Sequence, residues 1–280
     1  MKNYQRVLFP YAYNILGSAD DAKDAIQDVM SAFLTANHEH VGNEKNYLIR
    51  SVINRAITIK NKKKKLRYGD VWLPEPVATE GADTQADLKD IVSYSLLILL
   101  EQLTAKERAV FILKEAFSYS HEDISGVLST TVETSRKILS RAKEKLKQQP
   151  ASTRPKTGSS SEVLHHYIAA IRARNIEQLE ALLSQDIAFH ADGGANMNIV
   201  AKYLSGAHEV SGLLLYIYDK YQTGFFIIPA EINHEPSLLF YSGSTLVSCQ
   251  VFDLSPEGKI LRINTIIDPE KLKNIQLPVR

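Results

Sequence analysis

A histidine and an aspartate stand two residues apart in the sequence His190-Ala191-Asp192-Gly193-Gly194. Residues i and i+2 of a strand project from the same face of a sheet, and an imidazole beside a carboxylate in an apolar site can transfer a proton. Alternatively, Asp192 shapes a turn with the two glycines and His190 packs in the core. The second interpretation is favoured, because no further polar cluster completes an active site.

A second candidate for chemistry is DNA recognition by residues 103–146. Three short helical patterns follow one another there with almost no loop between them, and the last is basic. A tight turn before a basic helix is typical of a helix-turn-helix that enters the major groove. The residue pairs that mark helix starts are Thr104 with Glu107, Ser120 with Asp123, and either Thr130 or Thr131 at the third helix.

The third helix, over residues 132–147, has the residue types that base and phosphate contacts require. Small polar side chains in its first turn meet base edges, and cations further along meet phosphates. The side chains expected to contact DNA are Thr131, Glu133, Thr134, Arg136, Lys137 and Arg141. Alternatively, this is a surface helix with a solvated charged face, since such patterns recur by chance.

An acidic stripe marks the second of the helices expected over residues 4–66. It consists of Asp20, Asp21, Asp24 and Asp28. Only Lys23 balances it in this helix, and like charges at this spacing cost roughly a few tenths of a kcal/mol per pair. The stripe is either a solvated helix start, where acids favour the helix dipole, or a docking face for a basic partner. The helix that begins after Asn43 ends in a basic run, residues 60–67, which suits a phosphate-binding edge.

Taken together, these stretches resemble an extracytoplasmic-function RNA polymerase sigma factor. The resemblance rests on DAKDAIQDVMSAF, NYLIRSVINRAI, LTAKERAVFILKEAFSYSHEDISGVL and RKILSRAKEKL, and it covers roughly the first 147 residues. It implies an all-α sigma-2 domain over residues 1–67 and a helix-turn-helix sigma-4 domain over residues 91–149. It also implies that polymerase performs the phosphoryl transfer, so this chain is expected to be no enzyme and to need no cofactor or metal.

The resemblance further implies the partners, which are core RNA polymerase and promoter DNA. The acidic stripe would dock on the clamp helices of the beta-prime subunit, and the beta flap is a second contact. The basic helix of residues 132–147 would read the minus-thirty-five element. Strand melting needs a pocket for a splayed base and a cationic track. The candidates for minus-ten contacts are Asn54, Arg55, Lys60, Lys62 and Lys63.

Residues 68–90 form a linker with several prolines, glycines and acids, yet it contains Trp72 and Leu73. Apolar anchors in a polar linker usually dock on something. The pentapeptide Trp-Leu-Pro-Glu-Pro at 72–76 resembles the linker of one sigma-factor group, which carries an added C-terminal SnoaL-like domain. A further linker, rich in Ser, Thr and Pro, is expected over residues 150–160.

Residues 161–280 read as helices followed by strands, which predicts an α+β domain with a curved antiparallel sheet. They resemble the cone-shaped SnoaL-like fold of the nuclear-transport-factor-2 superfamily. Asp192-Gly193-Gly194 and residues 268–272 match two motifs of the group, although Ala195 replaces a third glycine. In that group the added domain regulates the sigma domains in cis. The residues expected to mediate this regulation are Trp72, Leu73, Pro74, Asp192, Gly193 and Gly194.

Composition excludes several classes of site. Cys249 is the lone cysteine, which excludes an intramolecular disulfide and a cysteine-cluster zinc site and suits a cytoplasmic location. No apolar run reaches the ~20 residues of a membrane span. A cone lined by Phe225, Phe226, Phe240 and Tyr241 would suit a small ligand.

The sequence therefore predicts an alternative sigma factor that directs promoter recognition and is controlled in cis by its C-terminal domain. One alternative is a SnoaL-type cyclase or isomerase with an N-terminal DNA-binding module. Another is a helix-turn-helix repressor that acts without polymerase. The acidic stripe argues against the repressor, because that face would have no purpose on DNA.

Overall fold

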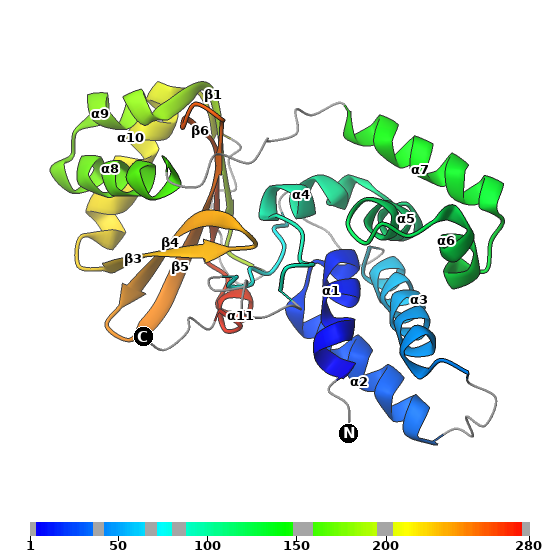
Figure 1. The fold of residues 1–280 in the computed structure, drawn as a ribbon. Coiled ribbons are helices and arrows are strands. Elements are labelled where there is room, and N and C mark those ends of the chain that lie inside the picture. Colours follow the sequence, from blue (N-terminus) through cyan, green and yellow to red (C-terminus); the bar gives the residue numbers. More distant parts are fainter. Residues whose placement is uncertain are drawn as a thin grey trace. The chain divides into compact units, whose positions relative to one another are not determined.

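Residues 4–64 and 88–147 contribute helices, whereas residues 159–275 contribute helices and a sheet, in the computed structural model (Figure 1). The structure describes residues 4–35, 42–64, 72–79, 88–147, 159–194 and 204–275. The chain divides into a first unit, residues 1–68 and 81–150, and a second unit, residues 69–80 and 151–280. The linker segment 72–79 therefore belongs to the second unit, although it lies between two parts of the first in sequence. No described helix is long and apolar enough to cross a membrane.

The first unit begins with three helices, α1 (Tyr4–Leu16), α2 (Ala19–Thr35) and α3 (Glu44–Lys64). Their apolar stripes bury one another, and Leu8, Ile26 and Ile53 are almost fully enclosed. Polar residues typical of helix caps precede α2 and α3: the Ser18 hydroxyl accepts a hydrogen bond from the Asp21 amide, and the Asn43 side chain accepts one from the Asn46 amide.

The same unit continues with α4 (Tyr94–Leu99), the 3₁₀ turn η2 (Leu100–Gln102), α5 (Ala105–Glu115), α6 (His121–Leu128) and α7 (Val132–Leu146). Both predicted capping boxes are confirmed, and Thr131, not Thr130, caps α7. The leucine-rich sequence of residues 87–103 predicts a single helix at the entry to this set, and that prediction is wrong. Residues 88–90 form a turn, and the Ser93 hydroxyl caps α4 only afterwards.

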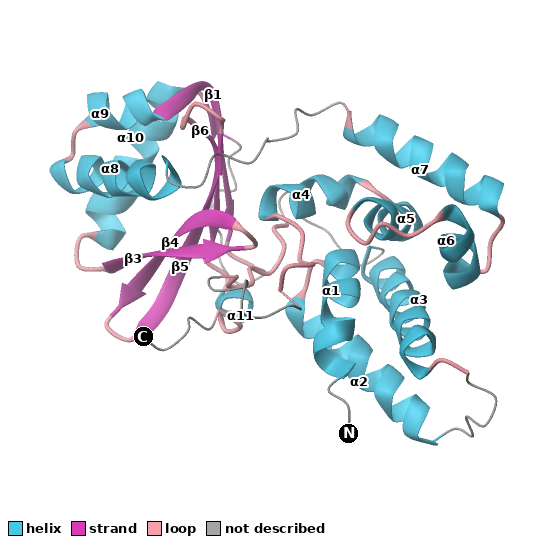
Figure 2. Ribbon diagram, viewed as in Figure 1, coloured by secondary structure: helices cyan, strands magenta, loops and turns pink. Residues whose placement is uncertain are grey.

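The second unit packs helices against one face of a six-stranded sheet (Figure 2). Tyr167, Leu214, Phe252 and Ile263 lie in the core between the two layers. The helical elements are α8 (Ser159–Ala173), α9 (Ile176–Leu182), α10 (Ala207–Ile217), the π-helical turn η3 (Tyr218–Gln222) and α11 (Pro269–Leu272). The strands are β1 (Leu183–Asp192), β2 (Leu204–Ser205), β3 (Phe226–Ile232), β4 (Glu235–Ser242), β5 (Thr245–Leu254) and β6 (Ile260–Ile266).

The sheet has the strand order β2-β1-β6-β5-β4-β3 and is mixed, so the prediction of a wholly antiparallel sheet is wrong. Strands β3 to β6 form an antiparallel meander, but β6 pairs with β1 in parallel. Parallel neighbours need a long crossover connection, and residues 193–259, which include α10, supply it. The sequence Ser-Pro-Glu-Gly at residues 255–258 predicts a hairpin turn, and this is confirmed, since the Gly258 amide donates to the Ser255 carbonyl.

Candidate functional site

The helix-turn-helix is formed by α6, a short turn and α7. Ser129 adopts a left-handed backbone with φ of 48° where α6 ends, which turns the chain sharply into α7. The His121 Nδ1 and the Ser135 hydroxyl lie 2.9 Å apart and join the two helices. The position of α7 relative to α6 is thus fixed by a partly buried polar contact as well as by apolar packing.

One stripe of α7 is buried and the rest faces solvent. Ser135, Leu139 and Ala142 form the buried stripe. The predicted DNA-contacting residues that are exposed are Thr131, Glu133, Arg136, Lys137 and Arg141, and Thr134 is half-buried. The Lys137 ammonium lies 2.6 Å from the Glu133 carboxylate, but an exposed pair of this kind contributes little to stability. The arrangement leaves a cationic, polar face of α7 available for a ligand.

The acidic stripe on α2 has more partners than Lys23. The Arg55 guanidinium donates to Asp28 at 2.5 and 2.9 Å, and the Lys63 ammonium lies 2.6 Å from Asp21. Arg55 and Lys63 were both predicted to contact DNA, so in this arrangement part of the basic edge of α3 neutralises the acidic stripe of α2. Asp24 and Lys62 are exposed.

The exposed side of α3 contacts the end of α6. The Asn54 amide donates to the Val127 carbonyl at 3.0 Å, and the Arg50 guanidinium donates to the Ser129 hydroxyl at 2.9 Å. Asn54 was predicted to contact the minus-ten element. In the structure it binds the segment that leads into α7.

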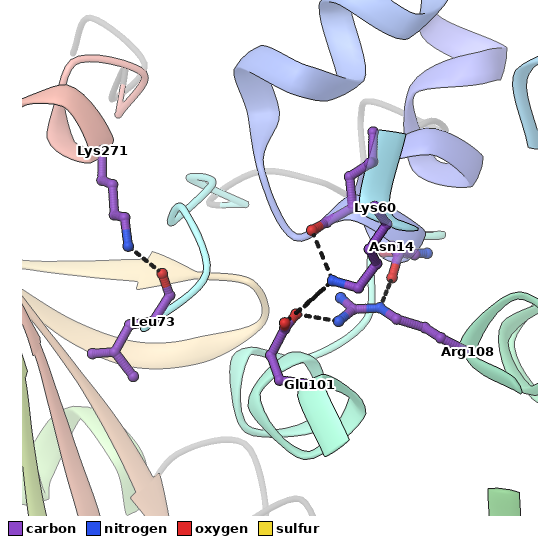
Figure 3. Close-up of polar contacts among 7 residues, drawn as sticks. Asn14, Lys60, Leu73, Glu101, Arg108 and Lys271 are labelled. Carbon is purple, nitrogen blue, oxygen red and sulfur yellow. Dashed lines mark hydrogen bonds and ion pairs between the residues drawn. The ribbon is translucent and has the colours of Figure 1, made fainter. Parts of the chain in front are cut away.

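Lys60 differs from the other predicted minus-ten residues, because its side chain is buried in the structure. Its ammonium lies 2.9 Å from Glu101 and 3.2 Å from the Leu16 carbonyl. Glu101 also pairs with the buried Arg108, whose Nε donates to the Asn14 carbonyl (Figure 3). The sequence placed Lys60 in a basic run, but its position on α3 points it inward, toward η2.

In the second unit, a buried lysine and aspartate hold the backbone of the linker segment. The Asp192 carboxylate accepts a hydrogen bond from the Leu73 amide at 2.7 Å. The Lys271 ammonium donates to the Leu73 carbonyl at 2.7 Å, as Figure 3 shows. Lys271 and Asp192 are themselves 2.6 Å apart. We call Asp192 and Lys271 the clasp. Because both polar groups of Leu73 are bound and its side chain is buried, the clasp fixes this residue fully.

Trp72 also contacts the clasp, since the Lys271 ammonium lies 4.6 Å from the centre of its ring. Cations over an indole face are attracted by its quadrupole. Burial lowers the pKa of Lys271, and the neighbouring Asp192 carboxylate opposes that shift. Pro74 is buried beside them.

A glycine turn and a helix cap position the two residues of the clasp. The Gly194 amide donates to the second oxygen of Asp192 at 2.9 Å, and the Asp192 carbonyl accepts the Ile267 amide at 2.8 Å. Gly194 has φ of +70°, and a Cβ on it would lie 2.5 Å from Asp268. Asp268 caps α11, which carries Lys271. The Asp192-Gly193-Gly194 motif and the motif at residues 268–272 thus lie side by side in the structure. Gly193 lies between Asp192 and Gly194 in the chain, and Ala195 lies outside the described residues.

Residues 77–79 add to the outer edge of β3. Val77 exchanges hydrogen bonds with Asn233, which is at the turn between β3 and β4. The Thr79 amide donates to the Glu231 carbonyl, and its hydroxyl donates to the Glu231 carboxylate. A segment in the extended conformation that pairs with the edge strand of a sheet gains main-chain hydrogen bonds, as in other cases of strand addition.

His190 and Asp192 have separate partners. The His190 Nδ1 lies 3.1 Å from the Asn264 oxygen, and burial lowers the pKa of His190. Asp192 holds the Gly194 turn and the linker, as described above. These contacts agree with the turn-and-packing interpretation, while the grip of Asp192 on Leu73 adds a role that the sequence did not specify.

The predicted aromatic lining of the cone is only partly correct. Phe240 and Phe225 pack in the core, but Phe226 is 66% exposed. Neighbouring residues of a strand project from opposite faces, so Phe240 and Tyr241 cannot line the same space. Lys271 and Asn233 were not among the predicted regulatory residues; for Lys271 the signal was its place in the motif at 268–272.

Comparison with known proteins agrees with this geometry. Residues 1–66 match the model for sigma-70 region 2, and residues 95–146 match that for sigma-70, region 4. The ECF RNA polymerase sigma factor SigJ of Mycobacterium tuberculosis is 27% identical over 98% of this chain and 92% of its own length. The probable ECF RNA polymerase sigma factor SigI of the same species is 23% identical over 96% and 92%. The crystal structure of SigJ has a TM-score of 0.76, with 21% identity over 98% of both chains.

The two sigma-70 regions, one on α1–α3 and the other on α4–α7, define a promoter-directing transcription initiation factor. More narrowly, the chain belongs to the extracytoplasmic-function sigma factors, with an added C-terminal α+β unit. We refer below to α1–α3 as the sigma-2 domain and to α4–α7 as the sigma-4 domain.

Proposed function

We propose that the C-terminal unit of this sigma factor restrains promoter recognition by holding the linker between the sigma-2 and sigma-4 domains. The observation that supports the proposal is the clasp, which binds both backbone groups of Leu73. The linker is the part of the chain that must adapt when two DNA-binding domains move onto separate promoter elements. A linker held on a third unit is less free to do so.

The proposed contacts with polymerase and DNA follow the predicted surfaces. The acidic stripe of α2 docks on the beta-prime clamp helices, and the sigma-4 domain contacts the beta flap. The exposed face of α7 reads the minus-thirty-five element, and Asn54, Arg55, Lys62 and Lys63 serve the minus-ten element. These interactions take place where polymerase and the chromosome are, in the cytoplasm.

The C-terminal unit acts in this proposal as a regulator and not as an enzyme. His190 is paired with Asn264, and Asp192 is occupied by Lys271 and Leu73, so neither is arranged for proton transfer to a substrate. The alternative of a cyclase or isomerase would require turnover by the full chain. A small-molecule ligand of the unit remains compatible with regulation.

The test is run-off transcription with core RNA polymerase on the promoter region upstream of the chain's own gene. The Lys271→Met variant removes the ammonium that donates to the Leu73 carbonyl and to Asp192, and we expect more transcript from it than from the original chain. Lys273→Met is the matched control, because Lys273 is exposed and pairs with Glu270 on its own turn. A chain that ends at Gln149 reports the effect of removing the whole unit.

Three results would contradict the proposal in different ways. Equal transcription from Lys271→Met, Lys273→Met and the original chain would remove the clasp from regulation. Less transcript from Lys271→Met than from Lys273→Met would reverse the sign of control. Failure of every form to bind core polymerase would contradict the sigma-factor assignment itself.

A further inference from the structure

A row of polar side chains lies between the helices and the sheet of the C-terminal unit. Gln250 of β5 is paired with Thr265 of β6, and Ser248 precedes Gln250 by two residues, so it projects from the same face. This face points toward the helices, because the Tyr167 hydroxyl of α8 donates to the Gln250 side chain at 3.2 Å. Each of these residues is at most 4% exposed. The core of this unit therefore contains neighbouring polar groups that are shielded from solvent.

The hydroxyls of Ser248 and Thr265 are buried without a hydrogen-bond partner among the described residues. The hydroxyl of Ser211, on the buried side of α10, is in the same condition. A buried hydroxyl that is left unpaired loses its hydrogen bonds to water without compensation. Alanine and valine have nearly the same shape as serine and threonine and would avoid this cost. The sequence thus keeps hydroxyls at positions where apolar side chains would stabilise the fold.

The sheet register brings these groups within reach of one small molecule. Side chains directly opposite each other on neighbouring strands have Cβ atoms about 4.5–5.5 Å apart, and diagonal neighbours are about 7–8 Å apart. Thr265 is opposite Gln250 and diagonal to Ser248. On its other side Thr265 is paired with Ala191 of β1, which adds only a methyl group to this face. A single ring with a polar substituent spans these distances.

The surroundings of the row favour a neutral ligand with an aromatic body. Tyr167 meets the ring of Phe252 edge-on, with ring centres 5.0 Å apart, and Phe240 is paired with Ser248 in the sheet. Burial raises the pKa of Tyr167, so its hydroxyl is neutral and remains a donor. An ionised ligand would lose its hydration here without gaining an opposite charge from this row. A carbonyl oxygen accepts hydrogen bonds from hydroxyls and carries no charge, so it matches the unpaired groups.

We propose that Ser248 and Thr265 form a binding site for a small neutral aromatic carbonyl compound, whose oxygen accepts hydrogen bonds from both hydroxyls. The site lies on the opposite face of the sheet from the clasp. Ala191 faces the site, and Asp192, the next residue of β1, projects from the other face and holds Leu73. The use of this site as a regulatory input rests on the proposed function, whereas the binding itself does not.

The experiment measures the binding of acetophenone, a neutral aryl ketone, to the full chain by isothermal titration calorimetry. The test variants are Thr265→Val and Ser248→Ala, each of which removes one unpartnered hydroxyl. The matched control is Ser237→Ala, because Ser237 is fully buried on the other face of the same sheet and its hydroxyl donates to the Glu235 carbonyl at 3.1 Å. The midpoint of thermal unfolding is measured for every form without acetophenone.

We expect the original chain to bind acetophenone and each test variant to bind it about fivefold more weakly, which corresponds to the loss of one neutral hydrogen bond. Without acetophenone, Thr265→Val should unfold at a higher temperature than the original chain, because a methyl group replaces an unpaired hydroxyl. Ser237→Ala should unfold at a lower temperature and should keep the original Kd, because its hydroxyl is paired and lies on the other face.

Three results would overturn the proposal. The first is the absence of binding by the original chain up to the solubility limit of acetophenone. The second is an equal Kd for the original chain and both test variants, which would place acetophenone elsewhere. The third is a lower unfolding temperature for Thr265→Val with an unchanged Kd, which would make its hydroxyl purely structural. Ser248→Ala keeps the test valid if Thr265→Val fails to fold. The clasp is tested separately by transcription from Lys271→Met, so failure of either proposal is distinguishable from failure of the other.

Discussion

The Lys271 ammonium lies 2.6 Å from the Asp192 carboxylate, and 79 residues separate the two in sequence. Both side chains are buried, and both bind Leu73. The pair therefore stabilises the C-terminal unit and also binds the linker. Substitutions can separate the two roles, because stability and linker release are measured differently.

Asp192→Asn should destabilise the C-terminal unit strongly. The substitution leaves the Lys271 cation buried without its carboxylate, and loss of one partner of a buried pair costs about 3–5 kcal/mol of the free energy of unfolding. Urea unfolding of the full chain measures the loss. Glu270→Gln removes an exposed carboxylate from the same turn and should change the stability by less than about 0.5 kcal/mol. Equal effects of the two variants would contradict the assigned importance of the buried pair.

Gly194→Ala should disturb the cap of α11. A Cβ at Gly194 would lie 2.5 Å from Asp268, and the backbone has φ of +70°. Gly243→Ala is the matched control, since its φ is +60° and nothing lies within 4 Å of the added Cβ. The control should lose about 1 kcal/mol from the left-handed backbone alone, and Gly194→Ala should lose more. Thermal unfolding compares them, and equal losses would show that the contact with Asp268 does not matter.

Arg141→Ala should weaken promoter binding by the polymerase complex about equally on all sequences. Arg141 is exposed on α7 and is proposed to meet a phosphate. Loss of one phosphate contact reduces the slope of log affinity against log salt by about 1. Lys106→Ala on α5 removes an exposed cation from another surface and should leave the slope unchanged. An unchanged slope for Arg141→Ala would remove this residue from the DNA interface.

Acidification should destabilise the C-terminal unit through His190. Burial lowers the pKa of His190 in the folded chain below its ordinary value of 6.5. Between those two pKa values the unfolded chain binds more protons, so the free energy of unfolding falls as the pH drops through 6.5. His190→Gln should show a smaller loss between pH 7.5 and pH 5.5 than the exposed control His165→Gln. Parallel curves for the two variants would contradict the assignment.

Local features of the fold were accessible from the sequence because they depend on neighbouring residues. The capping pairs at Thr104 and Ser120 are set by a spacing of three residues, and both are present. The parallel pairing of β1 with β6 was missed, because strand direction depends on a long crossover that periodicity does not report.

The candidate sites were likewise predictable only in part from the sequence. Residue types and spacing identified α7 and the anchors Trp72 and Leu73. They did not identify Lys271 as the partner of Leu73, nor Glu101 as the partner of Lys60. A basic run predicts positive charge but not which of its side chains are exposed. The position of each lysine around the α3 helix decides whether its side chain meets solvent or the interior.

Strand addition by residues 77–79 has a consequence for the released state. β3 is the last strand of the sheet, and the linker pairs with the Glu231 carbonyl and the Asn233 amide at its outer edge. Release would leave these groups unpaired, and an open sheet edge is a site for pairing between chains. Pro229 has no amide hydrogen, so pairing along β3 is interrupted two residues before Glu231. If the linker is released as proposed, Pro229 therefore shortens the run of edge amides that can pair with another chain.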